Sequence, residues 1–326
     1  MMEMNSFLRR ILADHYALKD IELRATSGGS EADRSVVMIR GGEKKYIFRV
    51  YPPENTRSNP TALAQVLSLL AEVDFPAERI ISATNGDALA EVDGWRTVLT
   101  TFIEGTPTDQ LDSEFYGLGA ILGRLHALFT PEELLARHVP TAERSLDAEM
   151  AMARRDLLAV PRPDQPELGA FYDELLAAID AIDRCHDLPY TLIHNDFQPG
   201  NVLLKADGLL SVIDWDGSGR SPGIVDLGYL IGHLHPEGSL RPEAARIHAL
   251  LDGYLQHKTL SQTEIERLSD MIRFRPITYL TSDFGNYIAH MDDPDPSYMH
   301  CLAIYHTVDE AAAIAREYIL SAKPPR

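Results

Sequence analysis

The chain has 326 residues, which is enough for about two domains. Hydrophobic residues make up 45% of it and charged residues 24%, which is an ordinary composition for a soluble globular protein. Its net charge of −19 argues against a nucleic-acid partner, because contacts to phosphates need a basic patch. Two isolated cysteines, Cys185 and Cys301, argue against a disulfide framework or a structural zinc site. The N-terminus lacks the apolar core of a signal peptide and no apolar run approaches membrane-spanning length, so we expect a cytoplasmic protein without a membrane partner.

The N-terminal part of the chain predicts a helix followed by an antiparallel meander. Apolar residues at helical spacing indicate a helix over residues 6–18, after which the period shifts towards two. The strands expected from this pattern are 21–24, 35–40, 45–51 and 95–102, with a helix over about 61–71 between the last two.

Ser27, Gly28 and Gly29 are expected between the first two strands. Glycines at such a place let backbone N–H groups approach a phosphate closely. A glycine pair between strands is also an ordinary hairpin turn, so both interpretations stay open.

The strand over 95–102 runs into a segment with Gly105 and Pro107, and a helical half follows. We therefore place a domain boundary there, with one domain over residues 1–104 and a second over 105–326. Helices are predicted over about 111–129, 143–158 and 166–185. His126 lies beside the apolar face of the first of them, and we interpret it as a packed structural histidine.

The stretch over residues 192–204 has apolar ends and a polar centre that holds His194, Asp196 and Asn201. Two short strands with Asp207-Gly208 at the turn follow, and they lead into Asp214 and Asp216. A hairpin returns the chain to its start, so we expect Asp196, Asn201 and Asp214 to meet in space. Two acids and an amide beside a loop can hold Mg²⁺ and phosphate oxygens.

This order of features suits a nucleotide, with phosphates at the glycines and a metal ion at the acid–amide–acid cluster. Phosphoryl transfer needs clamped phosphates and a carboxylate that orients and deprotonates the attacking hydroxyl. The sequence has no G-x-x-x-x-G-K-[ST] motif and no G-x-G-x-x-G that opens a helix, which excludes a P-loop ATPase and a Rossmann dehydrogenase. A metal hydrolase with His194, Asp196 and Asp214 as ligands would leave Asn201 and the glycines unexplained.

The pattern His194-x-Asp196-x-x-x-x-Asn201, followed by Ile213-Asp214-Trp215, resembles the catalytic and metal-binding loops of the aminoglycoside phosphotransferase/choline kinase family. The resemblance covers most of the chain, and the segment over residues 46–53 is somewhat closer to the homoserine-kinase-like branch. It implies an α+β fold of the protein-kinase type with two lobes: a small antiparallel-sheet N-lobe and a larger, mainly helical C-lobe. It also implies an ATP-dependent kinase that acts on a hydroxyl group.

The resemblance further implies roles for individual residues. Asp196 would be the catalytic base, and Asn201 and Asp214 would hold Mg²⁺. His194 and Asp226 would support the catalytic loop, Asp226 through backbone N–H groups. The residues implied for ATP are Ser27, Gly28, Gly29, Arg49, Phe102, Ile103 and Glu104.

Two positions depart from the family pattern. Arg49 stands where a lysine usually reaches the phosphates, and Gln65 stands where a glutamate usually holds that lysine; Glu72 is too far along the helix to replace it. Arginine can clamp phosphate bidentately, with Lys44 or Lys45 as further candidates, but an Arg–Gln pair lacks charge balance. The alternative function is therefore a catalytically impaired, nucleotide-binding pseudokinase with a regulatory role.

The acceptor site in this family lies mainly on helices after the metal loop, where this chain has Tyr279, Asp283 and His290. Nearby acidic residues favour a small hydroxylated acceptor that carries an amine, such as an aminoglycoside, an amino alcohol or homoserine. The acidic, proline-containing run over residues 291–297 is also typical of a solvated loop. Asp216 is a candidate for the acceptor, for a second metal ion or for capping a turn. The sequence indicates no oligomeric state.

Overall fold

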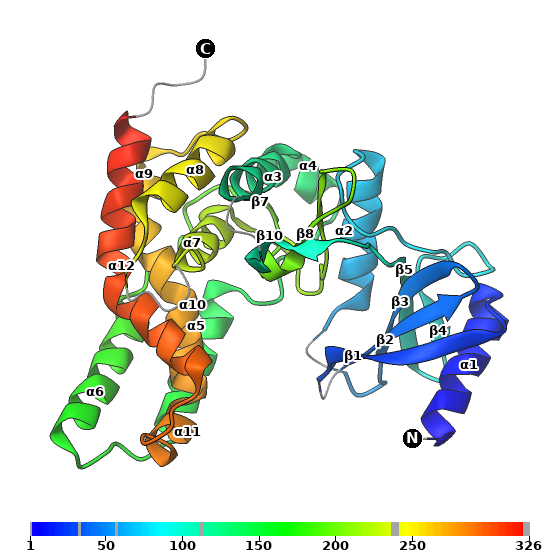
Figure 1. The fold of residues 1–326 in the computed structure, drawn as a ribbon, viewed down its shortest axis with the longest axis horizontal. Helices are drawn as coiled ribbons and strands as arrows, with labels where there is room; N and C mark the ends of the chain where they lie inside the picture. Colours follow the sequence, from blue (N-terminus) through cyan, green and yellow to red (C-terminus); the bar gives the residue numbers. More distant parts are fainter. Residues whose placement is uncertain (1, 32–33, 56–57, 111–113, 236–240, 322–326) are drawn as a thin grey trace. The chain divides into compact units, whose positions relative to one another are not determined.

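The computed structural model describes residues 2–31, 34–55, 58–110, 114–235 and 241–321 (Figure 1). The chain forms two compact units. Unit 1 consists of Met1–Gln110, His138–Glu143 and Gly200–Gly219, and unit 2 consists of Leu111–Arg137, Arg144–Pro199 and Arg220–Arg326. Unit 1 thus contains the hairpin that carries Asn201 and Asp214, although this hairpin comes late in the sequence. The functional boundary at residue 104 stays a prediction.

Unit 1 is built around one antiparallel sheet of five strands in the order β1-β2-β3-β5-β4. Its elements are α1 (Met2–Tyr16), β1 (Ile21–Glu31), β2 (Arg34–Gly41), β3 (Lys44–Tyr51), α2 (Pro60–Glu72), β4 (Ala90–Val92), β5 (Trp95–Thr101), β6 (Thr106–Pro107), β8 (Val202–Leu204) and β9 (Leu210–Val212), with short 3₁₀ turns at Thr108–Gln110 and Pro199–Asn201. The structure confirms the helices and strands predicted for this part to within a few residues, except that β1 is longer.

The longer β1 changes the place of the glycine pair. Ser27, Gly28 and Gly29 lie within β1 and not between β1 and β2, in the stretch from Ala25 to Ser30 where the register against β2 shifts. Small residues show no alternation of polar and apolar side chains, so the period-two pattern that marks a strand was not visible there.

The core of unit 1 lies between α1 and the sheet, as the blue helix beside the strands in Figure 1 shows. Leu8, Ile11 and Leu12 of α1 pack in one buried cluster with Ile39 and Phe48 of the sheet. This burial supplies the apolar contacts that hold the sheet, because a helix and a sheet each bury one apolar face against the other.

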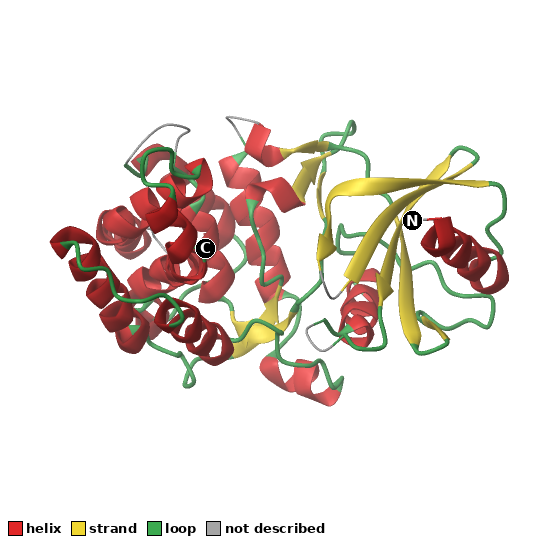
Figure 2. Cartoon of the chain, turned by 90° about the horizontal axis from the view of Figure 1, so that it is seen from below, coloured by secondary structure: helices red, strands yellow, loops and turns green. Residues whose placement is uncertain are grey.

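Unit 2 is mainly helical, as the red helices of Figure 2 show. Its elements are α3 (Phe115–Ala127), α4 (Pro131–Ala136), α5 (Leu146–Leu158), α6 (Pro166–Ala181), β7 (Tyr190–Ile193), β10 (Gly219–Pro222), α7 (Ile224–Gly232), α8 (Ala244–Leu255), α9 (Gln262–Glu266), α10 (Leu268–Ser282), α11 (Phe284–Ala289) and α12 (Pro296–Ser321). The predicted α+β class is confirmed, with an antiparallel sheet in the N-terminal part and helices in most of the remainder.

Helices α3 and α8 contact each other through their backbones. A Cβ atom added to Gly119 would lie 1.8 Å from the Leu250 carbonyl oxygen, and one added to Gly253 would lie 2.0 Å from that of Tyr116. Only glycine fits at such distances. The close approach brings α8 next to α3 at the point where His126 and Tyr254 meet.

Among the helices that the structure describes, none is both long enough and apolar enough to span a lipid bilayer.

Candidate active site

The loop that follows β7 is fastened to α7 by one carboxylate. Asp226, in the first turn of α7, accepts the backbone N–H groups of His194 at 2.7 Å and of Asn195 at 2.9 Å. Asp226 is only 1% exposed, and hydrogen bonds to a charged acceptor are about twice as strong as those between neutral groups. Asp226 thus connects this loop to α7, and its part in catalysis stays a prediction.

Asp226 is held in turn by the contact between α3 and α8. His126 Nε2 lies 3.5 Å from Asp226 Oδ2, and His126 Nδ1 lies 2.9 Å from the Tyr254 hydroxyl. His126 is fully buried, which agrees with its interpretation as a structural histidine.

The residue before Asp196 adopts an uncommon backbone conformation. Asn195 has φ +71°, in the left-handed region that asparagine tolerates better than most residues. Arg275 of α10 donates from Nη2 to the carbonyl oxygen of Asn195 and to its Oδ1 atom, the latter at 3.0 Å. Together with Asp226, Arg275 therefore fixes the direction in which the chain enters Asp196. No motif in the sequence pointed to Arg275.

The Asp196 side chain is half-buried, and its surroundings are polar. Its backbone N–H donates to His194 Nδ1 at 3.3 Å, and Gln198 Nε2 lies 3.4 Å from Asp196 Oδ2. Burial and then the negative charge of Asp196 raise the pKa of Tyr229, whose hydroxyl is a hydrogen-bond partner of this carboxylate. The fully buried His194 contacts the loop backbone, which suits support of the loop more than chemistry.

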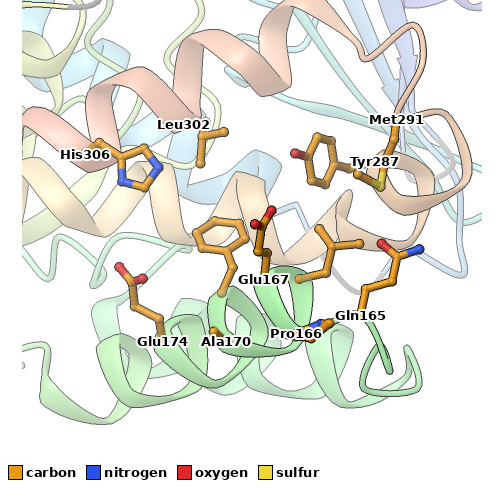
Figure 3. Close-up of a pocket in the computed structure, with 11 residues that line it drawn as sticks. Gln165, Pro166, Glu167, Ala170, Glu174, Tyr287, Met291, Leu302 and His306 are labelled. Atoms are coloured by element: carbon orange, nitrogen blue, oxygen red, sulfur yellow. The ribbon is translucent and has the colours of Figure 1, made fainter.

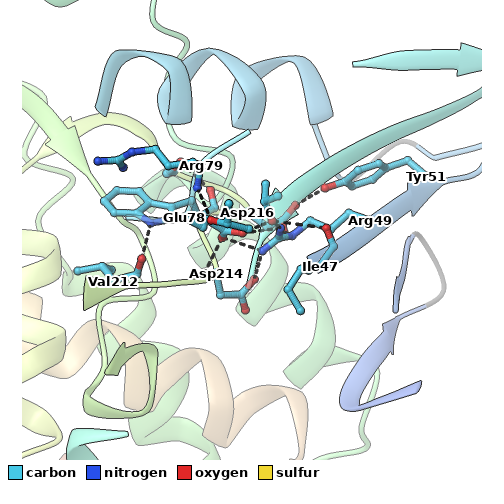
Figure 4. A network of polar contacts seen from close by, with 12 residues as sticks. Ile47, Arg49, Tyr51, Glu78, Arg79, Val212, Asp214 and Asp216 are labelled. Atoms are coloured by element: carbon cyan, nitrogen blue, oxygen red, sulfur yellow. Dashed lines mark hydrogen bonds and ion pairs between the residues drawn. The ribbon is translucent and has the colours of Figure 1, made fainter. Parts of the chain in front are cut away.

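In unit 1, Arg49 lies inside a cage of carboxylates (Figure 4). Its Nη1 and Nη2 atoms each lie 2.9 Å from one oxygen of Glu78, and Nε lies 2.8 Å from Asp216 Oδ2. Asp214 Oδ1 follows at 3.9 Å. Burial alone would lower the pKa of Arg49, but Glu78 and Asp216 outweigh it and hold that pKa well above its ordinary value.

The acidic partner of Arg49 is Glu78, and this corrects the expectation that Gln65 of α2 stands in the partner's place. Glu78 is 2% exposed, follows α2 in sequence, and also accepts hydrogen bonds from the Thr100 hydroxyl and from the Asp214 backbone N–H, the latter at 3.3 Å. The charge balance that an Arg–Gln pair would lack is therefore present.

Asp216 was assigned from the sequence to the acceptor, a second metal ion or a turn. In the structure its carboxylate accepts the Tyr51 hydroxyl at 2.6 Å and pairs with Arg49, and its side chain is only 9% exposed. Its charge is thus used inside unit 1, next to the Arg49–Glu78 pair.

The hairpin of β8 and β9 brings Asn201 and Asp214 together, because the Ile213 N–H donates to the Asn201 carbonyl oxygen at 3.0 Å. Asp214 has φ +63° and a side chain that is 40% exposed. Asp196 belongs to unit 2, so the meeting of all three residues stays a prediction.

An amide oxygen and a carboxylate suit Mg²⁺, which keeps several water ligands and binds few protein groups together with substrate phosphates. Within the ranges that the structure describes, no three His, Cys, Asp or Glu side chains gather as a self-sufficient metal site. The donor set of Asn201 and Asp214 therefore fits an ion that arrives with phosphate ligands.

The segment after β5 is tied to β3. The Phe102 N–H donates to the Lys45 carbonyl oxygen at 3.2 Å, and Lys45 Nζ lies 2.7 Å from Glu104 Oε1. The hydrogen bond and the charge of Lys45 lower the pKa of Glu104. Lys45 thus binds Phe102 through its carbonyl oxygen and Glu104 through its ammonium group. Ile103 lies between these two residues in the sequence.

The three acceptor candidates of the C-terminal helices lie around the junction of α10 and α11. Tyr279 is 36% exposed, Asp283 accepts from Asn286 Nδ2 at 3.4 Å, and the exposed His290 contacts the Asn286 carbonyl oxygen through Nδ1 at 3.0 Å.

A pocket of about 670 Å³ lies between α6 and the helices α11 and α12 (Figure 3). Glu167, Glu174, Tyr287 and His306 are among the residues that line it. Tyr279, Asp283 and His290 are not among its lining residues, so the structure does not gather those candidates in this pocket.

Comparison with known proteins places this geometry among phosphotransferases. A model of the phosphotransferase enzyme family matches residues 22–260. The homoserine kinase of Granulibacter bethesdensis is 26% identical over 321 residues, which cover 94% of this chain and 96% of that enzyme. A spectinomycin phosphotransferase solved with ADP and spectinomycin superposes with a TM-score of 0.67 at 16% identity, over 96% of this chain and 98% of the other. An amicoumacin kinase solved with AMP-PNP, Ca²⁺ and Ami gives a TM-score of 0.63 at 15% identity, over 96% of each chain.

Proposed function

Because the chain belongs to the phosphotransferase enzyme family, and so is a kinase with a hydroxyl acceptor, we propose that it uses ATP to phosphorylate a small amine-bearing alcohol. Homoserine is the first candidate, since a homoserine kinase matches nearly the whole chain. The observation that carries the proposal is the loop of Asp196, which Asp226 and Arg275 fix from both sides of Asn195. A carboxylate held in this way can orient an attacking hydroxyl.

In this proposal Asp196 accepts the proton of the acceptor hydroxyl as its oxygen bonds to the γ-phosphorus atom, while the bond from that phosphorus to the β–γ bridging oxygen breaks and ADP leaves. A positioned base of this kind contributes about 10²–10⁴-fold to a rate. His194 and Asp226 hold the loop, and they do not exchange protons with the substrate.

Asn201 and Asp214 would hold Mg²⁺, which when bound neutralises the charge of the phosphates. Glu78 accepts the Asp214 N–H, and Arg49 lies beside the Asp214 carboxylate, so both residues fix the orientation of that ligand. Arg49 thereby supports nucleotide binding through Asp214, because its donors contact Glu78 and Asp216.

For the nucleotide itself we propose contacts from two segments of unit 1. Backbone groups of Ser27, Gly28 and Gly29 would meet the phosphates, and those of residues 102–104 would meet the adenine. Residues 1–104 would then act as the nucleotide-binding lobe and residues 105–326 as the catalytic and acceptor-binding lobe, in a cytoplasmic enzyme.

The pseudokinase alternative was motivated by the Arg49 and Gln65 pair. That motive falls away because Glu78 supplies the missing carboxylate.

The test is a kinase assay with Mg-ATP over a panel of hydroxylated amines: L-homoserine, 3-amino-1-propanol, choline and spectinomycin. We expect turnover with at least one acceptor, its loss with EDTA and recovery with Mg²⁺, and its loss in Asp196→Asn. The exposed Asp164→Asn in unit 2 is the matched control and should behave as the wild type. Nucleotide binding, seen as a rise in melting temperature, without turnover of any acceptor would sink the proposal.

A further inference from the structure

Two arginines that no motif indicated lie near Asp196 in unit 2. Arg144 precedes α5, and Arg275 lies in α10. Both contact Glu149 of α5: Arg144 binds it through Nε at 2.8 Å and Nη2 at 3.2 Å, and Arg275 Nη1 lies 3.6 Å from its Oε2 atom. Glu149 is only 4% exposed, so one buried carboxylate is shared by two guanidinium groups.

Two nitrogen donors of the Arg275 guanidinium lack a hydrogen bond, although one of them, Nη1, lies in the ion pair with Glu149. The Arg275 side chain is 7% exposed and lies over the rings of Tyr229 and Phe274, at 5.2 and 4.9 Å from their centroids. Nη2 binds Asn195, but Nε and Nη1 make no hydrogen bond to any residue that the structure describes. A buried donor without a partner costs about 1–3 kcal/mol, and more when it is charged.

Glu149 alone does not balance the two arginines, and the other negative charge that acts on both of them is that of Asp196, the proposed catalytic base. Arg144 and Arg275 carry two positive charges against the one negative charge of Glu149, and Asp196 acts electrostatically on both arginines. Burial and then the repulsion from Arg144 lower the pKa of Arg275. The Arg144 side chain is 48% exposed and can be reached from solvent, whereas Arg275 lies buried behind it at 7% exposure.

We propose that Arg144 and Arg275 bind a carboxylate of the acceptor. The acceptor is then a hydroxy amino acid, and not an amino alcohol or an aminoglycoside, which have no carboxylate. Planar guanidinium donors match a carboxylate in geometry and charge. The inference rests on the proposed kinase function and specifies the substrate class of the same site. It narrows the expected amine-bearing acceptors to those that also carry a carboxylate.

A simpler role for the two arginines is structural: Arg275 holds the loop of Asp196 through Asn195, and Arg144 holds Glu149 beside Arg275. This role affects every acceptor equally, whereas recognition of a carboxylate affects only acceptors that have one. The two roles therefore differ in substrate preference.

The experiment measures kcat/KM for L-homoserine and for 3-amino-1-propanol, which is homoserine without its carboxylate. We expect the wild type to prefer L-homoserine at least about 100-fold, because a site built for a polar group strongly rejects an analogue that lacks it. Arg144→Met should lower this preference at least about tenfold, mainly through the KM for L-homoserine, and Arg144→Lys should restore part of it. Arg144 is half-exposed, so these variants should fold, which circular dichroism checks.

Arg154→Met is the matched control, because Arg154 is a surface residue of α5 with 46% exposure and an ion pair to Asp180. It should keep the wild-type preference. Equal use of both acceptors by the wild type, or an equal loss with both in Arg144→Met, would overturn carboxylate recognition and leave the kinase function standing. Turnover of spectinomycin or choline alone would also overturn it, whereas turnover of no acceptor would overturn the kinase proposal itself.

Discussion

The Arg49–Glu78 pair predicts a large loss of stability in Glu78→Gln. The change removes the carboxylate that contacts two nitrogens of the buried guanidinium, and it leaves Asp216 at 2.8 Å and Asp214 at 3.9 Å. Breaking a buried ion pair costs about 3–5 kcal/mol, and the remaining Asp216 should reduce this to about 2–3 kcal/mol. For a domain of the size of unit 1, each kcal/mol lowers the melting temperature by about 3–4 °C, so this temperature should fall by about 6–12 °C.

The assay is thermal unfolding followed by circular dichroism at neutral pH. Glu91→Gln is the matched control, because Glu91 is an exposed residue of β4 in the same unit, and it should melt with the wild type. Glu78→Gln should also raise the Mg²⁺ concentration needed for half-maximal activity, since Glu78 accepts the Asp214 N–H. A melting temperature within about 2 °C of the wild type, equal to that of Glu91→Gln, would refute the idea that Glu78 compensates Arg49.

Three more predictions follow from unit 2. Asp226→Asn weakens the hydrogen bonds from the His194 and Asn195 N–H groups, so kcat should fall about 100-fold while the KM for nucleotide stays unchanged. The free energy of unfolding, measured in urea, should fall by about 1.5–3 kcal/mol. An unchanged kcat would contradict the role of Asp226 in holding the loop. Gly253→Ala places a Cβ 2.0 Å from the Tyr116 carbonyl oxygen and should destabilise unit 2 by about 3 kcal/mol. Gly232→Ala is the control and should be close to neutral, because its added Cβ would lie 3.4 Å from Ile304. Equal melting temperatures of the two variants would show that α3 and α8 can separate at little cost. Burial lowers the pKa of His233 and of His235 below the ordinary 6.5. As the pH falls, the unfolded chain therefore takes up protons before the folded one does. The free energy of unfolding should fall below about pH 6.5, by up to about 1.4 kcal/mol per pH unit for each histidine. His233→Gln should reduce the difference in melting temperature between pH 7.5 and 5.5, and the exposed His257→Gln should not; the opposite order would refute this assignment.

The sequence predicted those parts of the fold that depend on local patterns. The hairpin of β8 and β9 was visible because Asp207-Gly208 marks its turn and apolar residues mark its strands, and this hairpin brings Asn201 beside Ile213. The loop of Asp196 was visible for a similar reason, since its polar residues lie close together in the sequence.

The partners of these residues could not be predicted, because they come from distant segments. Glu78 lies in an irregular segment with no periodicity, and it reaches Arg49 only because that segment pairs with β5 through Ile80 and Thr100. Arg275 lies in α10, which is buried on most of its faces, so no polar stripe set this residue apart. Local pattern thus identified the groups proposed for the chemistry, and tertiary packing determined which groups hold them.

The position of Glu78 also bears on how the enzyme can be regulated. Protein kinases carry the equivalent glutamate on a movable helix, and displacement of that helix breaks the ion pair and switches the enzyme off. Here Glu78 lies beyond the C-terminal end of α2. Its segment is joined to β5 by the hydrogen bond from the Thr101 N–H to the Arg79 carbonyl oxygen, and to β9 by the hydrogen bond from the Val212 N–H to the Pro76 carbonyl oxygen. Displacement of α2 would therefore have to break these bonds as well before it could separate Arg49 from Glu78.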